Sequence, residues 1–216
     1  QPMTTDELQP EGGWICLPKA RIAPPKPADR GAFFRSIALA SRLFGRKEVP
    51  DIFPVFHVNA RLFWAWLFFA SRLMPYGRLP ARAREKIILR TAWNCRSRYE
   101  WGQHVDIALS VGVPDDEILR VAKGPEAWSD RHERALMQAC DETFRDKCIS
   151  GPTWEILSER HSDQLLIEII ILIGHYEMVA GFLNSAGIAL EKPAERKLQD
   201  FYQRIRASGG SSASGG

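Results

Sequence analysis

Residues 85–104 read EKIILRTAWNCRSRYEWGQH and decide the fold class of this chain. The segment has the spacing of a helix, a short break and a second helix that begins near Ser97. It also brings Glu85, Glu100 and His104 close together in the sequence. General acid/base chemistry on a carbon acid uses such carboxylates and imidazoles, held near apolar surface. The stretch therefore predicts a pair of helices and a candidate acid/base site.

Helical spacing continues on both sides of this stretch. Apolar residues recur at helical intervals, and Pro or Gly separates the periodic segments. We expect helices at 31–45, 58–74, 80–93, 97–111, 115–123, 129–146, 151–160, 162–187 and 193–206. Candidate helix N-caps are Ser129, Ser150 and Ser162. No alternating run of β-branched residues lies between turns, so the sequence predicts an all-α fold.

The two ends of the chain differ from this helical middle. Residues 1–30 are rich in Pro and Gly and lack periodicity, which predicts an extended N-terminal arm. Trp14 in this arm is expected to pack on the core or on a neighbouring subunit. Residues 208–216 (SGGSSASGG) have the composition of a flexible linker. We therefore expect one all-helical domain at 31–207, between an arm and a flexible tail.

Composition limits the functional classes. The chain has 216 residues, a formal net charge of +3 and four Cys. Lys and Arg alternate with Asp and Glu without a basic run, which argues against nucleic-acid binding. No Cys pair has C-x-x-C spacing and no His pair accompanies the Cys at zinc-ligand spacing, so we expect no metal site and reduced thiols in a cytoplasmic protein. The apolar run at 165–190 contains ionisable residues and the run at 62–70 is short, so no membrane segment is expected.

Ser97, Glu100 and His104 share one face of the second predicted helix, because spacings of three and four residues place side chains one turn apart. A Glu one turn from a His can orient the imidazole, and His titrates near neutral pH. Two other roles stay open. The pattern Ser97-x-x-Glu100 is also that of a capping box, and a lone His among apolar residues can be a hydrogen-bonded core group.

The remaining candidates in the stretch have structural alternatives as well. Glu85 can carry a proton, or it can pair with a neighbouring Lys or Arg on a solvated face. Tyr99 can act as an acid, or it can fill a core or an interface. Arg90 and Arg98 can each bind a substrate carboxylate through two hydrogen bonds, although most Arg lie on surfaces. Trp101 is assigned, with Ser97, to substrate binding.

A second contribution is expected from the apolar segment that contains Glu168 and His175. The two residues are seven apart and therefore share a helix face. Burying ionisable groups in so apolar a helix is costly unless they have partners. We therefore assign Glu168 to substrate binding and His175 to catalysis, with a structural hydrogen-bonded pair as the alternative.

The frame formed by Glu85, Ser97, Glu100 and His104 resembles the carboxymuconolactone decarboxylase / alkylhydroperoxidase D-like (AhpD-like) family. In the peroxidase branch of that family the positions of Ser97 and Glu100 are a C-x-x-C pair, so the resemblance points to the branch without this pair. The segment IGHYEM at 173–178 supports the likeness. It implies an AhpD-like helical bundle that assembles as a homo-oligomer, namely a dimer, trimer or hexamer.

Members of this branch include lactone decarboxylases, which need no cofactor. The resemblance thus implies a lyase that decarboxylates a small carboxylated lactone or keto acid through an enolate. His104 would donate the proton to carbon, tuned by Glu100 and Glu85. A donor to the enolate oxygen is expected from His175 or Tyr99, and an anchor for the carboxylate from Arg90 or Arg98.

Three alternatives remain at this point. An isomerase or a retro-aldol lyase would pass through the same enolate. A thiol peroxidase would need Cys140 or Cys148 folded next to Cys95, which lacks a nearby partner in the sequence. A non-catalytic oligomeric scaffold would leave the acid/base residues exposed or tied up in salt bridges, without a shared cavity.

Overall fold

The computed structural model describes residues 8–34 and 49–211. Within these residues the chain is helical and has no β-strand, which confirms the all-α prediction. The helices are α2 (Ile52–Phe56), α3 (Ala60–Leu73), α4 (Ala81–Asn94), α5 (Arg98–Ser110), α6 (Asp115–Lys123), α7 (Arg131–Asp146), α8 (Gly151–Ser158), α9 (Asp163–Ala186) and α10 (Lys192–Ser211). Most of the helix expected at 31–45 lies outside the described residues.

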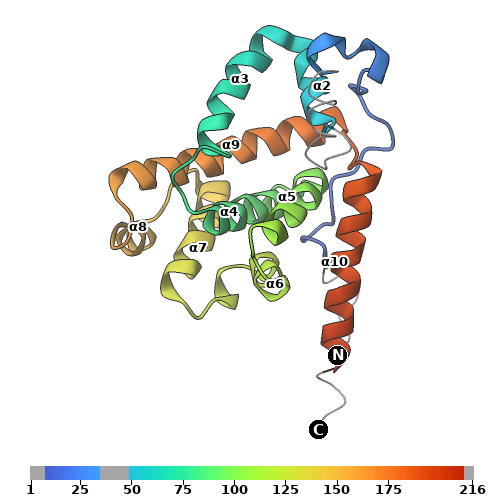
Figure 1. Ribbon diagram of the computed structural model, residues 1–216. Coiled ribbons are helices and arrows are strands. Elements are labelled where there is room, and N and C mark those ends of the chain that lie inside the picture. The colour runs from blue at the N-terminus through green and yellow to red at the C-terminus, as the bar shows by residue number, and fades with distance from the viewer. Residues whose placement is uncertain (1–7, 35–48, 212–216) are drawn as a thin grey trace.

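Helix α4 forms the centre of the core. It packs against α5, α6, α7 and α9, and Figure 1 shows it enclosed by these helices. Ile87, Ile88 and Leu89 at its middle have no exposed surface. Burying an aliphatic side chain of this size contributes roughly 2 kcal/mol. Polar groups on α4 are therefore carried by one of the most firmly held elements of the fold.

The N-terminal arm packs on the core of its own chain. Arg96, in the break between α4 and α5, has a left-handed φ of 55° and donates from Nε to the carbonyl of Gly13 at 2.5 Å. Trp14 lies against Trp93 and Trp101, with ring centroids 5.3 and 5.9 Å away. The arm thereby covers the break that separates α4 from α5.

Two helix boundaries, the start of α7 and the end of α10, differ from those expected from the sequence. Helix α7 is capped by Asp130 and not by Ser129, because the Asp130 carboxylate accepts hydrogen bonds from the backbone N–H groups of His132 and Glu133. Such a cap satisfies donors that the first turn leaves unpaired. Helix α10 continues through Ser211, so residues 208–211 of the expected flexible tail are helical.

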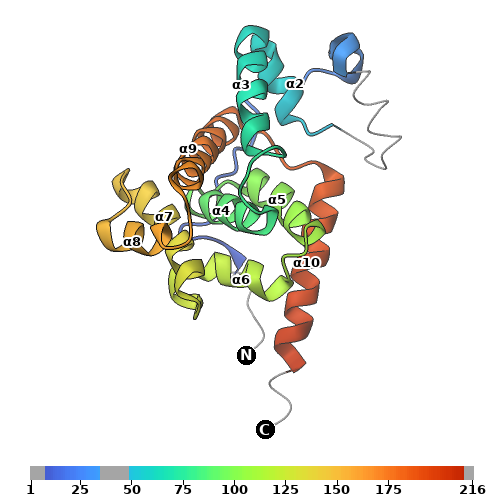
Figure 2. The same ribbon diagram turned by 60° about the vertical axis from the view of Figure 1, so that its left-hand side comes forward.

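Helices α2 and α3 project from the rest of the fold, as Figures 1 and 2 show. Two segments, Ile52–Leu73 and Asp163–Ala186, are long and apolar enough to cross a membrane by length and composition, which is weak evidence taken alone. Large apolar side chains of α3 and α9 face solvent, namely Leu62, Trp64, Phe68, Phe69, Ile167, Ile170, Ile171 and Met178. A soluble monomer rarely exposes so much apolar surface without a partner.

Candidate active site

A buried pair joins α4 to α5. Glu85 on α4 has no exposed surface, and its Oε2 lies 2.7 Å from Nδ1 of His104 on α5. Its other oxygen, Oε1, accepts a hydrogen bond from Nε of Arg84 at 3.0 Å. Burial by itself would raise the pKa of Glu85, but His104 and Arg84 outweigh burial and hold this pKa below its ordinary value. Glu85 is therefore an ionised carboxylate that orients the His104 ring.

Glu100 lies one helical turn before His104, so the two residues share a face of α5. Its side chain is buried, and among the described residues neither carboxylate oxygen has a hydrogen-bond partner. Burial raises the pKa of Glu100 well above its ordinary value, and the nearby Ser97 opposes this shift only weakly. Burial therefore favours the protonated, neutral form of Glu100. Ser97 is the N-cap residue of α5 but makes no side-chain cap, so the capping-box pattern is not used.

Tyr176 on α9 adds a fourth side chain to the acid/base cluster formed by Glu85, Glu100 and His104. Its ring meets the His104 ring edge-on, with centroids 5.1 Å apart. Burial raises the pKa of this phenol, and the charge of Glu85, together with that of Glu100 at a pH where Glu100 ionises, raises it further, which places Tyr176 near both carboxyl groups. Tyr176 is not among the site residues expected from the sequence, although it directly follows His175 in the IGHYEM segment.

His175 faces α3. Its ring is stacked on Trp66, with centroids 6.1 Å apart, and contacts Phe69 and Tyr176. Among the described residues its Nδ1 has no hydrogen-bond partner. Burial lowers the pKa of His175 to about 4, so the ring is neutral at physiological pH. Glu168 does not accompany it, because that carboxylate accepts hydrogen bonds from the backbone N–H groups of Arg78 and Leu79 before α4.

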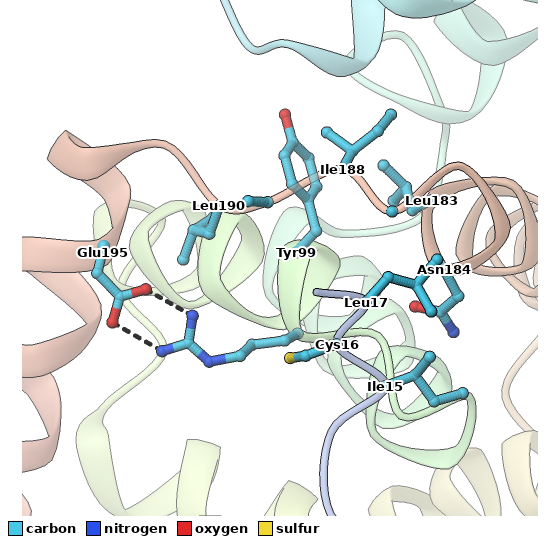
Figure 3. Close-up of a pocket in the computed structure, with 12 residues that line it drawn as sticks. Ile15, Cys16, Leu17, Tyr99, Leu183, Asn184, Ile188, Leu190 and Glu195 are labelled. Carbon is cyan, nitrogen blue, oxygen red and sulfur yellow. Dashed lines mark hydrogen bonds and ion pairs between the residues drawn. The ribbon is translucent and has the colours of Figure 1, made fainter. Parts of the chain in front are cut away.

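Tyr99 and Arg98 line a different pocket of about 300 Å³ between the arm, α5, α9 and α10 (Figure 3). Arg98 makes two hydrogen bonds to Glu195, at 2.5 and 2.7 Å. The Tyr99 hydroxyl donates to Glu191 at 2.5 Å and accepts from a backbone N–H. Neither Glu85, Glu100 nor His104 lines this pocket. Both side chains therefore connect α5 to other elements, and we do not place them at the acid/base cluster.

Two further candidates have structural partners. Arg90 donates to both carboxylate oxygens of Asp141, at 2.6 and 2.8 Å, and to the carbonyls of Val121 and Ala122 at the end of α6. Its donors are thus used to join α4, α6 and α7. Trp101 is buried, and its Nε1 donates to the Tyr202 hydroxyl at 3.0 Å. These contacts give Arg90 and Trp101 a role in stability.

Two of the four cysteines, Cys95 and Cys140, have raised pKa values. Cys95 is half-buried, and burial, followed by the charges of Glu100 and Glu177, raises its pKa to about 12. Cys140 is buried, with its pKa also raised to about 12, whereas Cys148 is exposed. The thiolate is the reactive form of Cys, so both shifts oppose reactivity. Within residues 8–34 and 49–211, no group of three or more His, Cys, Asp or Glu is placed to hold a metal ion.

The model of the carboxymuconolactone decarboxylase family matches residues 60–142, which include Glu85, Glu100 and His104. A peroxidase-related protein from Ralstonia eutropha JMP134 with an AhpD core superposes with a TM-score of 0.70 at 18% identity, over 82% of this chain and 95% of its own. A peroxidase-related protein from Silicibacter sp. TM1040 gives 0.67 at 15% identity, over 83% and 93%.

A third similar structure is the debrominase Bmp8 in complex with 2,3,4-tribromopyrrole. Its variant in that complex gives a TM-score of 0.68 at 13% identity, over 85% of this chain and 98% of its own. At these identities the likeness concerns the fold. No curated protein sequence matches the chain at a significant level.

Proposed function

We propose that this chain is a cofactor-independent lyase that decarboxylates a small carboxylated lactone or keto acid. The carboxymuconolactone decarboxylase family model matches residues 60–142, and proteins with an AhpD-like fold superpose on the chain, which supports this assignment. One observation carries the proposal: the Glu85 carboxylate, whose pKa is lowered, is bonded to His104, and one helical turn before His104 lies Glu100, a buried acid whose pKa is raised well above its ordinary value. Two carboxyl groups whose environments separate their pKa values are typical of acid/base sites.

The proposed reaction breaks the bond between the carboxylate carbon and the neighbouring carbon. CO2 leaves, and the electron pair of the broken bond moves into the substrate carbonyl to form an enolate. The neutral acid of Glu100 donates a hydrogen bond to the developing oxyanion. Tyr176 is a second donor if its hydroxyl exchanges the weak bond that it makes to Sδ of Met74 at 3.5 Å for the oxyanion. His104, oriented by Glu85 at Nδ1, delivers a proton from Nε2 to carbon and completes the product.

The main alternative uses the same cluster. An isomerase or a retro-aldol lyase would also form an enolate and would also need a proton carrier and an oxyanion donor. Thiol peroxidation is less favoured, because Ser97 and Glu100 replace the C-x-x-C pair and Cys95 has a raised pKa. A scaffold without catalysis would leave these side chains exposed or tied up in salt bridges, and Glu85 is indeed paired with Arg84 and His104. It does not explain Glu100, a buried carboxyl group without a hydrogen-bond partner among the described residues. The debrominase complex contains a small ring compound on a similar frame, which is compatible with a small ring substrate here.

The test is proton NMR in D2O with a panel of γ-carboxylated lactones and β-keto acids. We expect the wild type to release CO2 and to incorporate deuterium at the adjacent carbon, and His104→Ala to lose both activities. His161→Ala is the matched control, because His161 lies between α8 and α9 and outside the cluster. Deuterium incorporation without CO2 release would favour the isomerase, and an unreactive wild type would leave the decarboxylase without support.

We also propose that the chain forms a homo-oligomer through the exposed apolar side chains of α3 and α9. Phe68 on α3 is 66% exposed and Ile167 on α9 is 61% exposed, so each helix presents large apolar side chains to solvent. Sedimentation velocity should give a species heavier than the 24.5 kDa chain. Phe68→Glu should dissociate it, whereas Tyr76→Glu, at an exposed aromatic outside these helices, should not. A wild-type monomer that binds liposomes would point to a membrane instead.

A further inference from the structure

Arg84 has an unusual position for a cation. It precedes Glu85 near the start of α4, and only 7% of its surface is exposed. Its Nε donates to Glu85, but among the residues that the structure describes no acceptor is found for its two terminal nitrogens. By comparison, Arg90 and Arg98 each use two nitrogens on a carboxylate. Neither terminal nitrogen is among the fully buried atoms that lack a partner, so both reach the surface and are open to an incoming acceptor.

The net charge of the cluster favours the binding of one anion. Glu85 is ionised, but its two oxygens are shared between Arg84 and His104. Burial raises the pKa values of the other acidic groups nearby, Glu100 and Tyr176, and so favours their neutral forms. The cluster is therefore neutral when His104 is neutral, and it carries a charge of +1 when His104 is protonated. A single negative charge on a ligand would complement it.

We infer that Arg84 is the anion anchor of this site and binds one carboxylate of the substrate through its two terminal nitrogens. The planar guanidinium matches the two oxygens of a carboxylate, so the geometry favours a carboxylate over a neutral amide or ester. This inference rests on the proposed function, because it places the substrate at the Glu85–His104 pair. It assigns to Arg84 the role that the sequence suggested for Arg90 or Arg98.

The experiment uses acetate and acetamide, which have similar size and shape but differ in charge. Each is titrated at millimolar concentration into the protein, and the imidazole signal of His104 is followed by heteronuclear NMR. Acetate should shift this signal in the wild type and acetamide should not. Arg84→Gln should weaken acetate binding at least about tenfold, as expected for the loss of a charged two-point contact. Arg98→Gln is the control and should bind acetate like the wild type.

Arg84→Lys keeps the positive charge next to Glu85, so it provides a second test if Arg84→Gln does not fold. It should bind acetate more weakly than the wild type, because an ammonium lacks the two-point geometry. Unchanged acetate affinity in either variant, equal binding of acetamide, or no acetate binding by the wild type would overturn the inference. Acetate binding and turnover are measured separately. Acetate binding through Arg84 without any decarboxylation would contradict the proposed function and leave the anion anchor standing. Turnover by Arg84→Gln with an unchanged KM would sink the anchor alone.

Discussion

Replacing Glu100 with Gln should stabilise the protein at neutral pH. Glu100 is 2% exposed, and burial raises its pKa well above the ordinary value of 4.5. Between pH 4.5 and the raised pKa, the folded chain keeps a proton that the unfolded chain releases. The free energy of unfolding therefore falls as pH rises through this window. Gln is neutral at every pH and similar in shape, so the variant should lack this loss.

The size of the effect follows from proton linkage. Each pH unit in the window costs the wild type about 1.4 kcal/mol relative to the variant. For a chain of this length that corresponds to a difference in Tm of about 3–5 °C for each pH unit. Thermal unfolding should therefore give similar Tm values for the two proteins near pH 4, and a gap that widens up to the pH at which Glu100 ionises.

Glu85→Gln is the matched control of opposite sign. The pKa of Glu85 is lowered in the folded chain, so its contribution to stability is present above pH 4.5 and is lost as pH falls through the lowered pKa. That variant should be less stable than the wild type at pH 7, and the deficit should shrink in acid. Parallel Tm curves for the wild type and Glu100→Gln from pH 4 to pH 8 would refute the assignment of a neutral acid at this position.

Three further predictions concern the residues around the site. Arg90→Met should lower the free energy of unfolding by about 2–4 kcal/mol in urea titrations, because it leaves two carbonyls without their donor and the Asp141 carboxylate with Asn94 as its remaining donor, while activity per folded molecule should not change. Cys95 should react with DTNB far more slowly than the exposed Cys16 and Cys148, because burial raises its pKa to about 12; rapid labelling of Cys95 would reopen the redox interpretation. His175 should show no titration of its ring protons by NMR between pH 5 and pH 8, because burial lowers its pKa to about 4; a midpoint near 6.5 would mean that the ring is solvated.

The helical frame could be predicted from the sequence because its signals are local. The periodic segment at 115–123 corresponds to α6, and the break before Ser97 separates α4 from α5. The N-cap of α7, Asp130, could not be predicted from such local signals. Ser129 and Asp130 are both good caps, and only the folded backbone decides which side chain reaches the first N–H groups.

The site was harder to predict, because it depends on contacts between distant segments. The sequence placed Glu85, Glu100 and His104 in one frame, and the fold brings Glu85 and His104 into contact. It could not show which arginines are free to bind a substrate. Arg90 and Arg98 pair with Asp141 and Glu195, which lie 51 and 97 residues further along the chain. The partners of an Arg side chain over such separations are set by tertiary packing and leave no local pattern.

The proposed acid/base chemistry requires one neutral and one ionised carboxyl group in the same buried cluster. The most direct measurement is a pH titration of the Glu side-chain carboxyl carbons by 13C NMR, with Glu100→Gln and Glu85→Gln used to assign the two signals. We predict that the Glu100 signal titrates well above the ordinary pKa of 4.5 and the Glu85 signal below it. If both signals titrate near 4.5, the cluster contains two ordinary carboxylates and the proposed acid/base chemistry loses its basis.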